Sequence, residues 1–340
     1  VVMATITDVA KHAGVSIKTV SRVMNNYEHI SAKTRDKVRA SILALNYAPN
    51  SIAQQMRLGD QLSIGMLYGD PSSGYQARLN HAVLKACSDA RRYLAVELFD
   101  EESTEWRQQV EAFLDRTRVQ NIILVPPMCD SSDLHALLKE RGVRFALISP
   151  SRPVSGASSI AMDDRLAAME VTQHLIDLGH KRIGHIGGDY GHVATLLRRQ
   201  GYEEALLKAG LGRPDAALIE SGRFSFKEAL ACADRMLTVR DRPTAIFAAN
   251  DEMAAAVVMT ANRLGLSVPG DLSVAGFDNT PISQTIWPEL TTISQPFAEI
   301  AKEAVRLSDY HPTGGNGVSA TQVLPHKLLV RESTGPAPKG

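Results

Sequence analysis

A short stretch near the start of the chain combines hydrogen-bonding and basic side chains with just enough apolar residues to hold a helix. In "GVSIKTVSRVMNN", residues 14–26, Val15, Val20 and Val23 can face a core, while Lys18 and Arg22 lie among hydroxyl residues on the other side. Small hydroxyl side chains let a backbone approach phosphate, and an arginine fork can read guanine bidentately. The face therefore suits DNA, although a solvated helix face in an ordinary bundle would carry the same pattern.

The neighbouring residues predict the helices that would position this face. Thr7 can cap "DVAKHAG", which ends at Gly14, Ser16 can cap the stretch above, and Ser31 can cap "AKTRDKVRASILALNY", which Pro49 stops. Two helices joined by a turn of three to four residues that contains glycine form a helix-turn-helix. In that motif the second helix lies in the major groove of DNA.

After residue 62 the pattern changes to apolar runs of strand length that alternate with amphipathic stretches of helix length. This alternation predicts parallel sheets with helices on both faces. About nine strands are too many for one compact sheet of this kind, so we expect two α/β lobes that divide near Met162. The predicted strands are "LSIGMLYG", "LAVELF", "NIILVPP", "RFALIS", "SSIAM", "RIGHIGG", "ALIES", "TAIFAAN" and "LSVAGFD".

Charge is distributed unevenly along a chain whose formal net charge is zero. Residues 1–60 contain eight basic and four acidic side chains, so they carry +4 and the remainder carries −4. A basic head on a mildly acidic body is an electrostatic hint of a nucleic-acid partner.

Cysteine usage and hydropathy suggest where the protein works. The three cysteines, Cys87, Cys129 and Cys232, are far apart and odd in number, which suits reduced thiols in a cytosolic protein. We find no metal-ligand spacing, no signal-peptide pattern and no apolar run of membrane-spanning length. We therefore expect a cytoplasmic protein without membrane contact or bound metal, and a disordered tail, "STGPAPKG".

The motifs together closely resemble the lactose/galactose repressor family of bacterial transcription regulators. The resemblance rests on "ATITDVAKHAGVSIKTVSRVMNN", "NYAPNSIAQQMRLG", "DLGHKRIGHIGG", "RRQGYEEAL", "NDEMAAAV", "DLSVAGFDN" and "PELTTISQP", in family order and spacing. It implies an all-α helix-turn-helix head at residues 1–48, a hinge helix and linker at 49–60, and a two-lobed body at 61–340 that resembles periplasmic binding proteins. We expect lobe 1 at about 61–161 and 292–322, and lobe 2 at about 162–291 and 323–335.

The resemblance also implies which residues would touch DNA. Ile17, Lys18 and Arg22 fall at the base-reading positions, and Ile17 can offer only apolar contact, most simply with a thymine methyl group. Met56 takes the place of the family's usual leucine, which wedges into the minor groove at the palindrome centre. The further DNA contacts that we expect are Thr7, Ser16, Thr19, Ser21, Asn25, Ser31, Thr34, Asn50, Ala53 and Arg57.

The family's effector contacts fall in loops that follow predicted strands of the body. Arginine, asparagine and aspartate can bind neighbouring hydroxyl groups, while an aromatic ring covers the C–H face of a sugar. His192 and Ala194 stand where several relatives have an arginine and a hydroxyl residue, which favours a neutral sugar over a phosphorylated or carboxylated effector. Trp287 could reach the cleft mouth or pack in the core. The expected effector contacts are Tyr75, His192, Arg198, Phe224, Asn250 and Asp278.

These expectations describe a ligand-responsive repressor rather than an enzyme. It would bind a palindromic operator in double-stranded DNA as a homodimer, and a small effector, a sugar or glycoside, would release it. A nucleoside- or nucleobase-responsive regulator of the same family and a periplasmic solute-binding protein are the alternatives. A nucleotide-dependent enzyme is disfavoured because the sequence has no catalytic pair, dinucleotide fingerprint or cofactor motif.

Overall fold

The computed structural model describes residues 4–24, 27, 30–47, 63–69, 73–99, 103–308 and 321–339. The chain divides into two compact units, residues 1–62 and 63–340. Asn25 and the predicted hinge residues Asn50, Ala53, Met56 and Arg57 lie outside the described residues.

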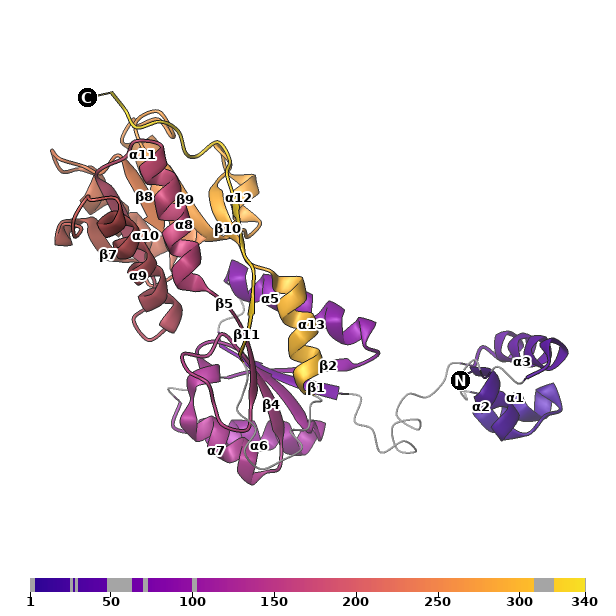
Figure 1. Cartoon of the computed structure of the whole chain (residues 1–340). Coiled ribbons are helices and arrows are strands. Elements are labelled where there is room, and N and C mark those ends of the chain that lie inside the picture. Colours follow the sequence, from indigo (N-terminus) through magenta and orange to yellow (C-terminus); the bar gives the residue numbers. More distant parts are fainter. Residues whose placement is uncertain are drawn as a thin grey trace. The chain divides into compact units, whose positions relative to one another are not determined.

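The first unit is a small helical bundle whose apolar residues share one core. Val20 and Val23 are buried in it with Val9 and Val38, and Val15 packs against them, as the sequence predicted. Gly14 ends the first helix with a φ of 58°, the left-handed conformation that glycine adopts without strain. The helices are α1 (Ile6–Ala13), α2 (Ile17–Met24) and α3 (Ala32–Ala44) (Figure 1).

The start of α1 differs from the prediction. Thr5 is the N-cap: its side chain accepts the Asp8 N–H, and the Asp8 carboxylate accepts the Thr5 N–H at 2.8 Å. This reciprocal capping box satisfies two donors at once. Thr7 could not form one, because the residue three positions after it is Ala10. Thr7 lies inside the helix instead. Ser16 and Ser31 do cap α2 and α3, accepting the N–H groups of Thr19 and Thr34.

The second unit consists of two lobes, each built on a six-stranded sheet. The two strand orders, β2-β1-β3-β4-β5-β11 and β7-β6-β8-β9-β10-β12, follow the same topology. Every pairing is parallel except that of β12 with β10. The strands of the first sheet are β1 (Ser63–Tyr68), β2 (Tyr93–Leu98), β3 (Asn121–Leu124), β4 (Arg144–Ile148), β5 (Ser158–Met162) and β11 (Thr321–Leu324); those of the second are β6 (Ile183–Gly187), β7 (Ile219–Ser221), β8 (Ala245–Ala248), β9 (Ser273–Asp278), β10 (Thr291–Ser294) and β12 (Lys327–Leu329).

Helices cover both faces of each sheet, as the alternating pattern predicted (Figure 1). In lobe 1, α5 and α13 cover one face, and α6 and α7 the other. In lobe 2, α8 and α9 cover one face, and α10 and α11 the other. The helices are α5 (Gly74–Asp89), α6 (Trp106–Thr117), α7 (Ser132–Glu140), α8 (Asp164–Asp177), α9 (Val193–Lys208), α10 (Phe226–Leu237), α11 (Asp251–Arg263), α12 (Ile282–Thr285) and α13 (Phe297–Ser308), with 3-10 turns at Met128–Asp130 and Ala216–Leu218.

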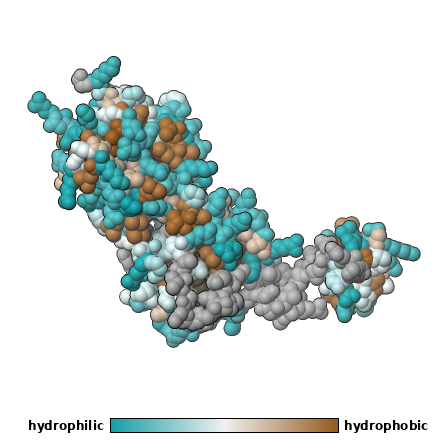
Figure 2. Space-filling model, in the orientation of Figure 1, coloured by the Kyte–Doolittle hydropathy of each residue, from teal (hydrophilic) through white to brown (hydrophobic). Residues whose placement is uncertain are grey.

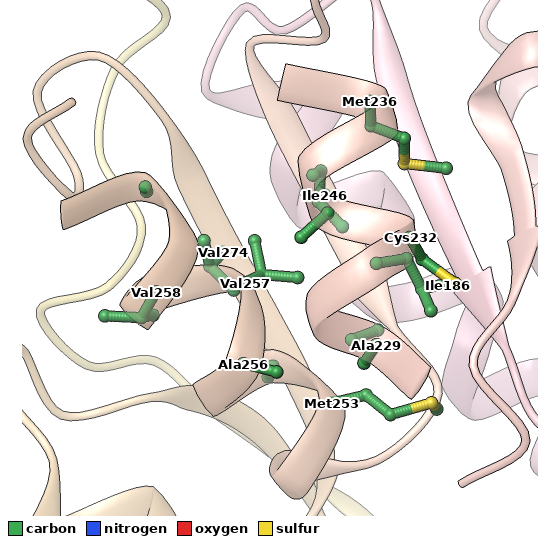
Figure 3. Packing of buried hydrophobic residues seen from close by; sticks show 14 of the residues in the cluster. Ile186, Ala229, Cys232, Met236, Ile246, Met253, Ala256, Val257, Val258 and Val274 are labelled. Atoms are coloured by element: carbon green, nitrogen blue, oxygen red, sulfur yellow. The ribbon is translucent and has the colours of Figure 1, made fainter. Parts of the chain in front are cut away.

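Apolar packing holds α10 and α11 to the second sheet. Cys232 and Met236 of α10, and Met253 and Val257 of α11, belong to one buried cluster with residues of the strands that both helices cover (Figure 3). Because α11 begins at the carboxyl end of β8, this packing fixes the direction in which its first turn points. On the surface, by contrast, apolar residues lie in separate patches among hydrophilic side chains on the face drawn in Figure 2.

Strand pairing corrects the lobe boundaries that we expected. Met162 and residues 323–324 belong to the first sheet, whereas residues 292–294 belong to the second, so each crossing between lobes lies slightly later than predicted. The lobe to which a short strand belongs depends on the strand with which it pairs, and the pattern of apolar residues does not reveal that partner.

The C-terminal segment is ordered along lobe 2, contrary to our expectation for "STGPAPKG". Ser333 is completely buried, and its hydroxyl donates to the Val274 carbonyl at 2.6 Å. The Ala337 N–H donates to the Leu178 carbonyl at 2.9 Å. Specific partners for these backbone groups outweigh the weak pattern of the local sequence.

Candidate functional site

The polar face of α2 is exposed, while the opposite face of the helix packs against α1 and α3. Lys18 and Arg22 are exposed, as is Ile17, at 37 % of its surface. The Arg22 guanidinium lies 5.2 Å from the centre of the Tyr27 ring. Val20 and Val23 on the opposite side hold the helix to its bundle. The helix thus presents cations and hydroxyl groups to solvent from a firmly packed support.

Hydroxyl pairs mark the starts of both α2 and α3. The hydroxyls of Ser16 and Thr19 are 2.9 Å apart, and those of Ser31 and Thr34 are 2.8 Å apart. The first backbone N–H groups of a helix have no acceptor within the helix, and such groups can bind anions. Ser21 lies further along α2, after the Ser16 and Thr19 pair. That these residues contact phosphate remains a prediction.

A second candidate site lies between the two lobes of the larger unit. A cavity of about 700 Å³ is lined by all six residues that the sequence predicted, Tyr75, His192, Arg198, Phe224, Asn250 and Asp278. Lobe 1 contributes a largely apolar wall that includes Phe99, Pro126, Pro127, Met128 and Pro150, and lobe 2 contributes most of the charged side chains. Their common position follows from the fold, because the loops after parallel strands meet at one edge of each sheet.

Arg198 is the electrostatic centre of the polar wall. It is buried in α9, and its Nε donates to Asp164 Oδ1 at 2.8 Å while its Nη1 donates to the Ala249 carbonyl at 2.5 Å. Its Nη2 lies 3.6 Å from Asp278 Oδ1, and its guanidinium stacks 3.7 Å from the centre of the Phe277 ring. Burial alone would lower the pKa of Arg198, but the carboxylates of Asp164 and Asp278 raise it above its ordinary value.

Asp278 is a buried carboxylate with an unusual backbone. Burial raises its pKa to about 6, although Arg198 and a hydrogen bond from Gln295 Nε2 at 2.6 Å act in the opposite direction. Its φ is 99°, a region that non-glycine residues rarely occupy. Such strain is typical of functional sites, where the surrounding structure holds it in place. The carboxylate can accept hydrogen bonds from hydroxyl groups in the cavity.

Asn250 has a structural role besides facing the cavity. It is the N-cap of α11, where its Oδ1 accepts the Met253 N–H at 2.9 Å, and its Nδ2 donates to the Phe224 carbonyl at 3.3 Å. An amide has two N–H donors, so one remains for a ligand. Asn250 therefore links the start of α11 to the loop that carries Phe224.

Aromatic side chains enclose the cavity from both lobes. His192 and Phe224 meet edge to face with 5.5 Å between ring centres, and Tyr75 lies 5.5 Å from Phe297. Burial lowers the pKa of His192 despite the opposing effect of Asp189, so the neutral imidazole is favoured. Burial also raises the pKa of the Tyr75 hydroxyl, which stays protonated and can donate a hydrogen bond. These rings suit the C–H face of a small ligand.

Several polar residues of the cavity escaped the sequence analysis, among them Asp164, Glu252 and Gln295. Asp164 closely follows β5, a predicted strand, so attention to every polar residue after a strand would have found it. Gln295 follows β10, which the sequence analysis did not predict, so that signal was missing. Trp287 is 78 % exposed and is not among the residues that line the cavity, so it neither reaches the cleft mouth nor packs in the core.

The described residues also bear on two other classes of site. No group of three or more His, Cys, Asp or Glu side chains among them could hold a metal ion. None of their helices is both long and apolar enough to span a membrane. All three cysteines are buried thiols.

Comparison with known families assigns the two units. The model of "Bacterial regulatory proteins, lacI family" matches residues 5–50, and that of "Periplasmic binding protein-like domain" matches residues 172–334. The chain is 34 % identical over 334 residues to the HTH-type transcriptional repressor PurR of Mannheimia succiniciproducens, covering 97 % of this chain and 98 % of that protein. It is also 34 % identical over 310 residues to the ribose operon repressor of Escherichia coli, covering 89 % and 91 %.

Solved structures agree over nearly the whole chain. The lac repressor dimer bound to operator and the anti-inducer ONPF superimposes with a TM-score of 0.78 at 30 % identity, covering 98 % of this chain and 99 % of that one. The complex of the transcriptional regulator CelR with cellobiose gives a TM-score of 0.71 at 28 % identity, covering 97 % and 99 %.

Proposed function

Because this chain belongs to the LacI family of ligand-responsive bacterial transcription repressors, we propose that it binds a palindromic operator as a homodimer. A small neutral sugar or glycoside enters the cavity between the lobes, changes their relative orientation and releases the operator. The head supplies half of the DNA contacts, so two copies read the two halves of the palindrome.

The arrangement of the cavity is the observation that carries the effector proposal. Arg198, Asn250 and Asp278 offer donors and acceptors on the lobe 2 side, and aromatic and proline rings offer an apolar surface on the lobe 1 side. A pyranose or furanose ring matches both walls, because its hydroxyl groups form hydrogen bonds at the ring edge and its C–H groups form an apolar face. Arg198 is already paired with two carboxylates, and Arg223 is paired with Asp189, so neither arginine among the described residues of the cavity is spare for a phosphate group.

Exposure of the α2 side chains supports the DNA part of the proposal. Ile17, Lys18 and Arg22 are the base readers, and Ser16, Thr19, Ser21, Ser31 and Thr34 seat the head on phosphates. Thr7, in the first turn of α1, adds a further contact to the phosphate backbone of the DNA. The exposed cations bind without first breaking buried ion pairs.

An apolar surface of lobe 1 is the best candidate for the dimer contact. β2 is the edge strand of its sheet, and its Val96 and Leu98 are 47 % and 59 % exposed. Tyr93 at the start of β2 and Leu84 on α5 are also more than half exposed. Exposed apolar side chains beside a free strand edge favour association with another copy.

Operator release in solution tests the proposal. The full chain is bound to a fluorescent operator duplex, and anisotropy is followed with D-ribose, D-glucose, cellobiose, an aryl β-glucoside, adenosine and inosine. Thermal shifts of the same mixtures identify binding, since a ligand raises the apparent stability by mass action. We expect a sugar or glycoside to stabilise the protein and to release the operator. Release by nucleosides alone would contradict the sugar assignment, and a sugar that strengthens operator binding would contradict induction.

A further inference from the structure

A single carboxylate connects the two lobes beside the cavity. Glu252, in the first turn of α11 in lobe 2, accepts the Gly74 N–H at 2.8 Å through Oε1. Gly74 is the first residue of α5 in lobe 1. The first N–H groups of a helix have no acceptor within the helix and favour a negative charge. Glu252 thus caps a helix that belongs to the opposite lobe.

The absence of a side chain at residue 74 allows this close approach. A Cβ atom there would lie 2.4 Å from Glu252 Oε1, 3.0 Å from Thr280 Cγ2 and 3.1 Å from Thr280 Cβ. The glutamate could swing away, but Thr280 cannot, because its N–H and hydroxyl donate to Asp251 at 2.6 Å and 3.0 Å. The contact between the lobes therefore depends on glycine.

A second contact reinforces the same junction. Arg78, one turn further along α5, donates from its guanidinium to the carbonyl of Asn279 in lobe 2 and lies 5.3 Å from the Phe297 ring. Asn279 directly follows the cavity residue Asp278, and Thr280 follows Asn279. One short turn of lobe 2 thus contributes both to the cavity and to the contact with α5.

The other oxygen of Glu252 is without a hydrogen-bond partner among the described residues. Glu252 Oε2 is buried, and Glu252 lines the cavity. A buried carboxylate oxygen that accepts no hydrogen bond is costly, so a donor supplied by a ligand would be favoured there. A sugar hydroxyl is such a donor.

We propose that Glu252 is a latch that joins the effector to lobe 1, with Oε1 on the Gly74 N–H and Oε2 on a hydroxyl group of the effector. This inference rests on the proposed effector site. The bound hydroxyl fixes the carboxylate in the position that caps α5, so the effector strengthens the closed arrangement of the lobes. When the latch is broken, fewer molecules have their lobes closed around the cavity. The apparent affinity for the effector is then the intrinsic affinity multiplied by the fraction of molecules that are closed.

The first test measures the arrangement of the lobes without any sugar. Spin labels are attached to the full chain at Asp133→Cys on α7 and Lys227→Cys on α10, two exposed positions in first turns beside the cavity, while the native cysteines are buried. Gly74→Ala should shift the distance distribution to longer separations. The matched control is Gly187→Ala, where an added Cβ would meet no atom closer than 3.5 Å. An unchanged distribution in Gly74→Ala would overturn the latch.

The second test isolates the effector contact of Oε2. Glu252→Gln keeps an oxygen for the Gly74 N–H but places an NH₂ donor in the cavity in place of Oε2. Titration calorimetry with cellobiose and D-ribose should show about tenfold weaker binding of whichever sugar the wild-type protein binds, with the spin-label distances nearly unchanged. Glu299→Gln, the same exchange at an exposed first-turn position of α13, is the control. Equal affinities for Glu252→Gln and wild type would overturn this contact.

The two tests separate failure of the latch from failure of the proposed function. If no compound of the panel binds the wild-type protein, the sugar assignment fails, but the distance measurements still decide whether Gly74 and Glu252 hold the lobes together. If a sugar binds and releases the operator while both variants behave as wild type, the proposed function stands and the latch is wrong.

Discussion

The recognition face of α2 and the cavity between the lobes use similar side chains in opposite ways. On α2 the arginine and lysine are exposed, and one short helix supplies the whole surface. In the cavity Arg198 is buried and held by two carboxylates from α8 and β9, which are over one hundred residues apart in sequence. This contrast supports the proposal that the first region binds a large polyanion and the second a small neutral ligand.

This difference implies that substitutions should separate function from stability in one region but not in the other. An exposed side chain contributes little to the free energy of unfolding, whereas a buried charge without its partner is strongly destabilising. The following predictions test that contrast, beginning with the largest expected effect.

Arg198→Met should be the most destabilising of these changes. It leaves Asp164 and Asp278 buried without their counter-charge, so we expect a loss of about 3–5 kcal/mol in the free energy of unfolding of the body. Arg223→Met, which breaks an ion pair whose arginine side chain is 68 % exposed, should cost at most about 1 kcal/mol. Thermal and urea unfolding of the two variants measure the difference. Similar losses would show that burial does not separate these two cavity arginines.

Asp278→Ala should separate sensing from DNA binding. The variant loses the carboxylate that faces the cavity, and we expect sugar affinity to fall by about 1.5–3 kcal/mol, while operator affinity without sugar stays within about twofold. Anisotropy of an operator duplex titrated with the active sugar provides both values. Release at the wild-type sugar concentration would exclude Asp278 from the effector site.

Arg22→Ala should change DNA recognition without changing stability. Loss of a bidentate base contact costs about 1–3 kcal/mol of discrimination, so the ratio of specific to non-specific affinity should fall about 10- to 100-fold. The melting temperature should hardly move, because the side chain is exposed. Arg39→Ala, an exposed position on α3, should leave the ratio intact in the same competition assay. An unchanged ratio in Arg22→Ala would remove Arg22 from base readout.

Asp251 should make stability depend on pH near neutrality. Burial raises its pKa to about 7, above the value in the unfolded chain, so the folded protein binds the proton more tightly and gains stability as pH falls from 8 toward 6. Asp251→Asn removes this dependence and keeps the network, since the Thr292 hydroxyl can accept where it now donates at 2.6 Å. We expect a difference of about 1 kcal/mol across this window between variant and wild type.

Melting temperatures at pH 6.5 and 8 measure the Asp251 effect. Buried histidines such as His185, whose pKa burial lowers to about 4, also change stability in this window, because histidine in the unfolded chain titrates near 6.5. Their contribution rises with pH and is the same in both proteins, so the difference between wild type and Asp251→Asn isolates Asp251. A difference in melting temperature between the two proteins that stays the same at pH 6.5 and at pH 8 would contradict the prediction.

Local patterns were sufficient for much of this structure. The apolar runs predicted nine strands, β1 to β9, and a division between lobes near Met162, because the alternation of strands and amphipathic helices follows which side chains are buried. Spacing within α2 identified its buried and exposed faces. Thr7 was mistaken for a cap, since Thr5 and Asp8 together satisfy more donors than a lone threonine.

The resemblance to the repressor family predicted six residues that line the cavity, but not the contacts between them. The pairing of Arg198 with Asp164 and Asp278 joins α9 to the start of α8 and the end of β9, which only the packing of these helices on the second sheet brings together. The latch of Glu252 on Gly74 joins residues that are 178 positions apart. No periodicity records such a contact, because it depends on how closely two lobes approach.

The sequence by itself therefore determined the helix-turn-helix, the two α/β lobes and the edge at which each lobe presents its polar loops. Only the tertiary structure decided that β10 and β12 pair with the second sheet and β11 with the first, and that the tail after Leu329 is bound along lobe 2. Short segments carry too few side chains to specify their own partners. Their positions depend on which sheet edge and which buried donors and acceptors the rest of the chain leaves available.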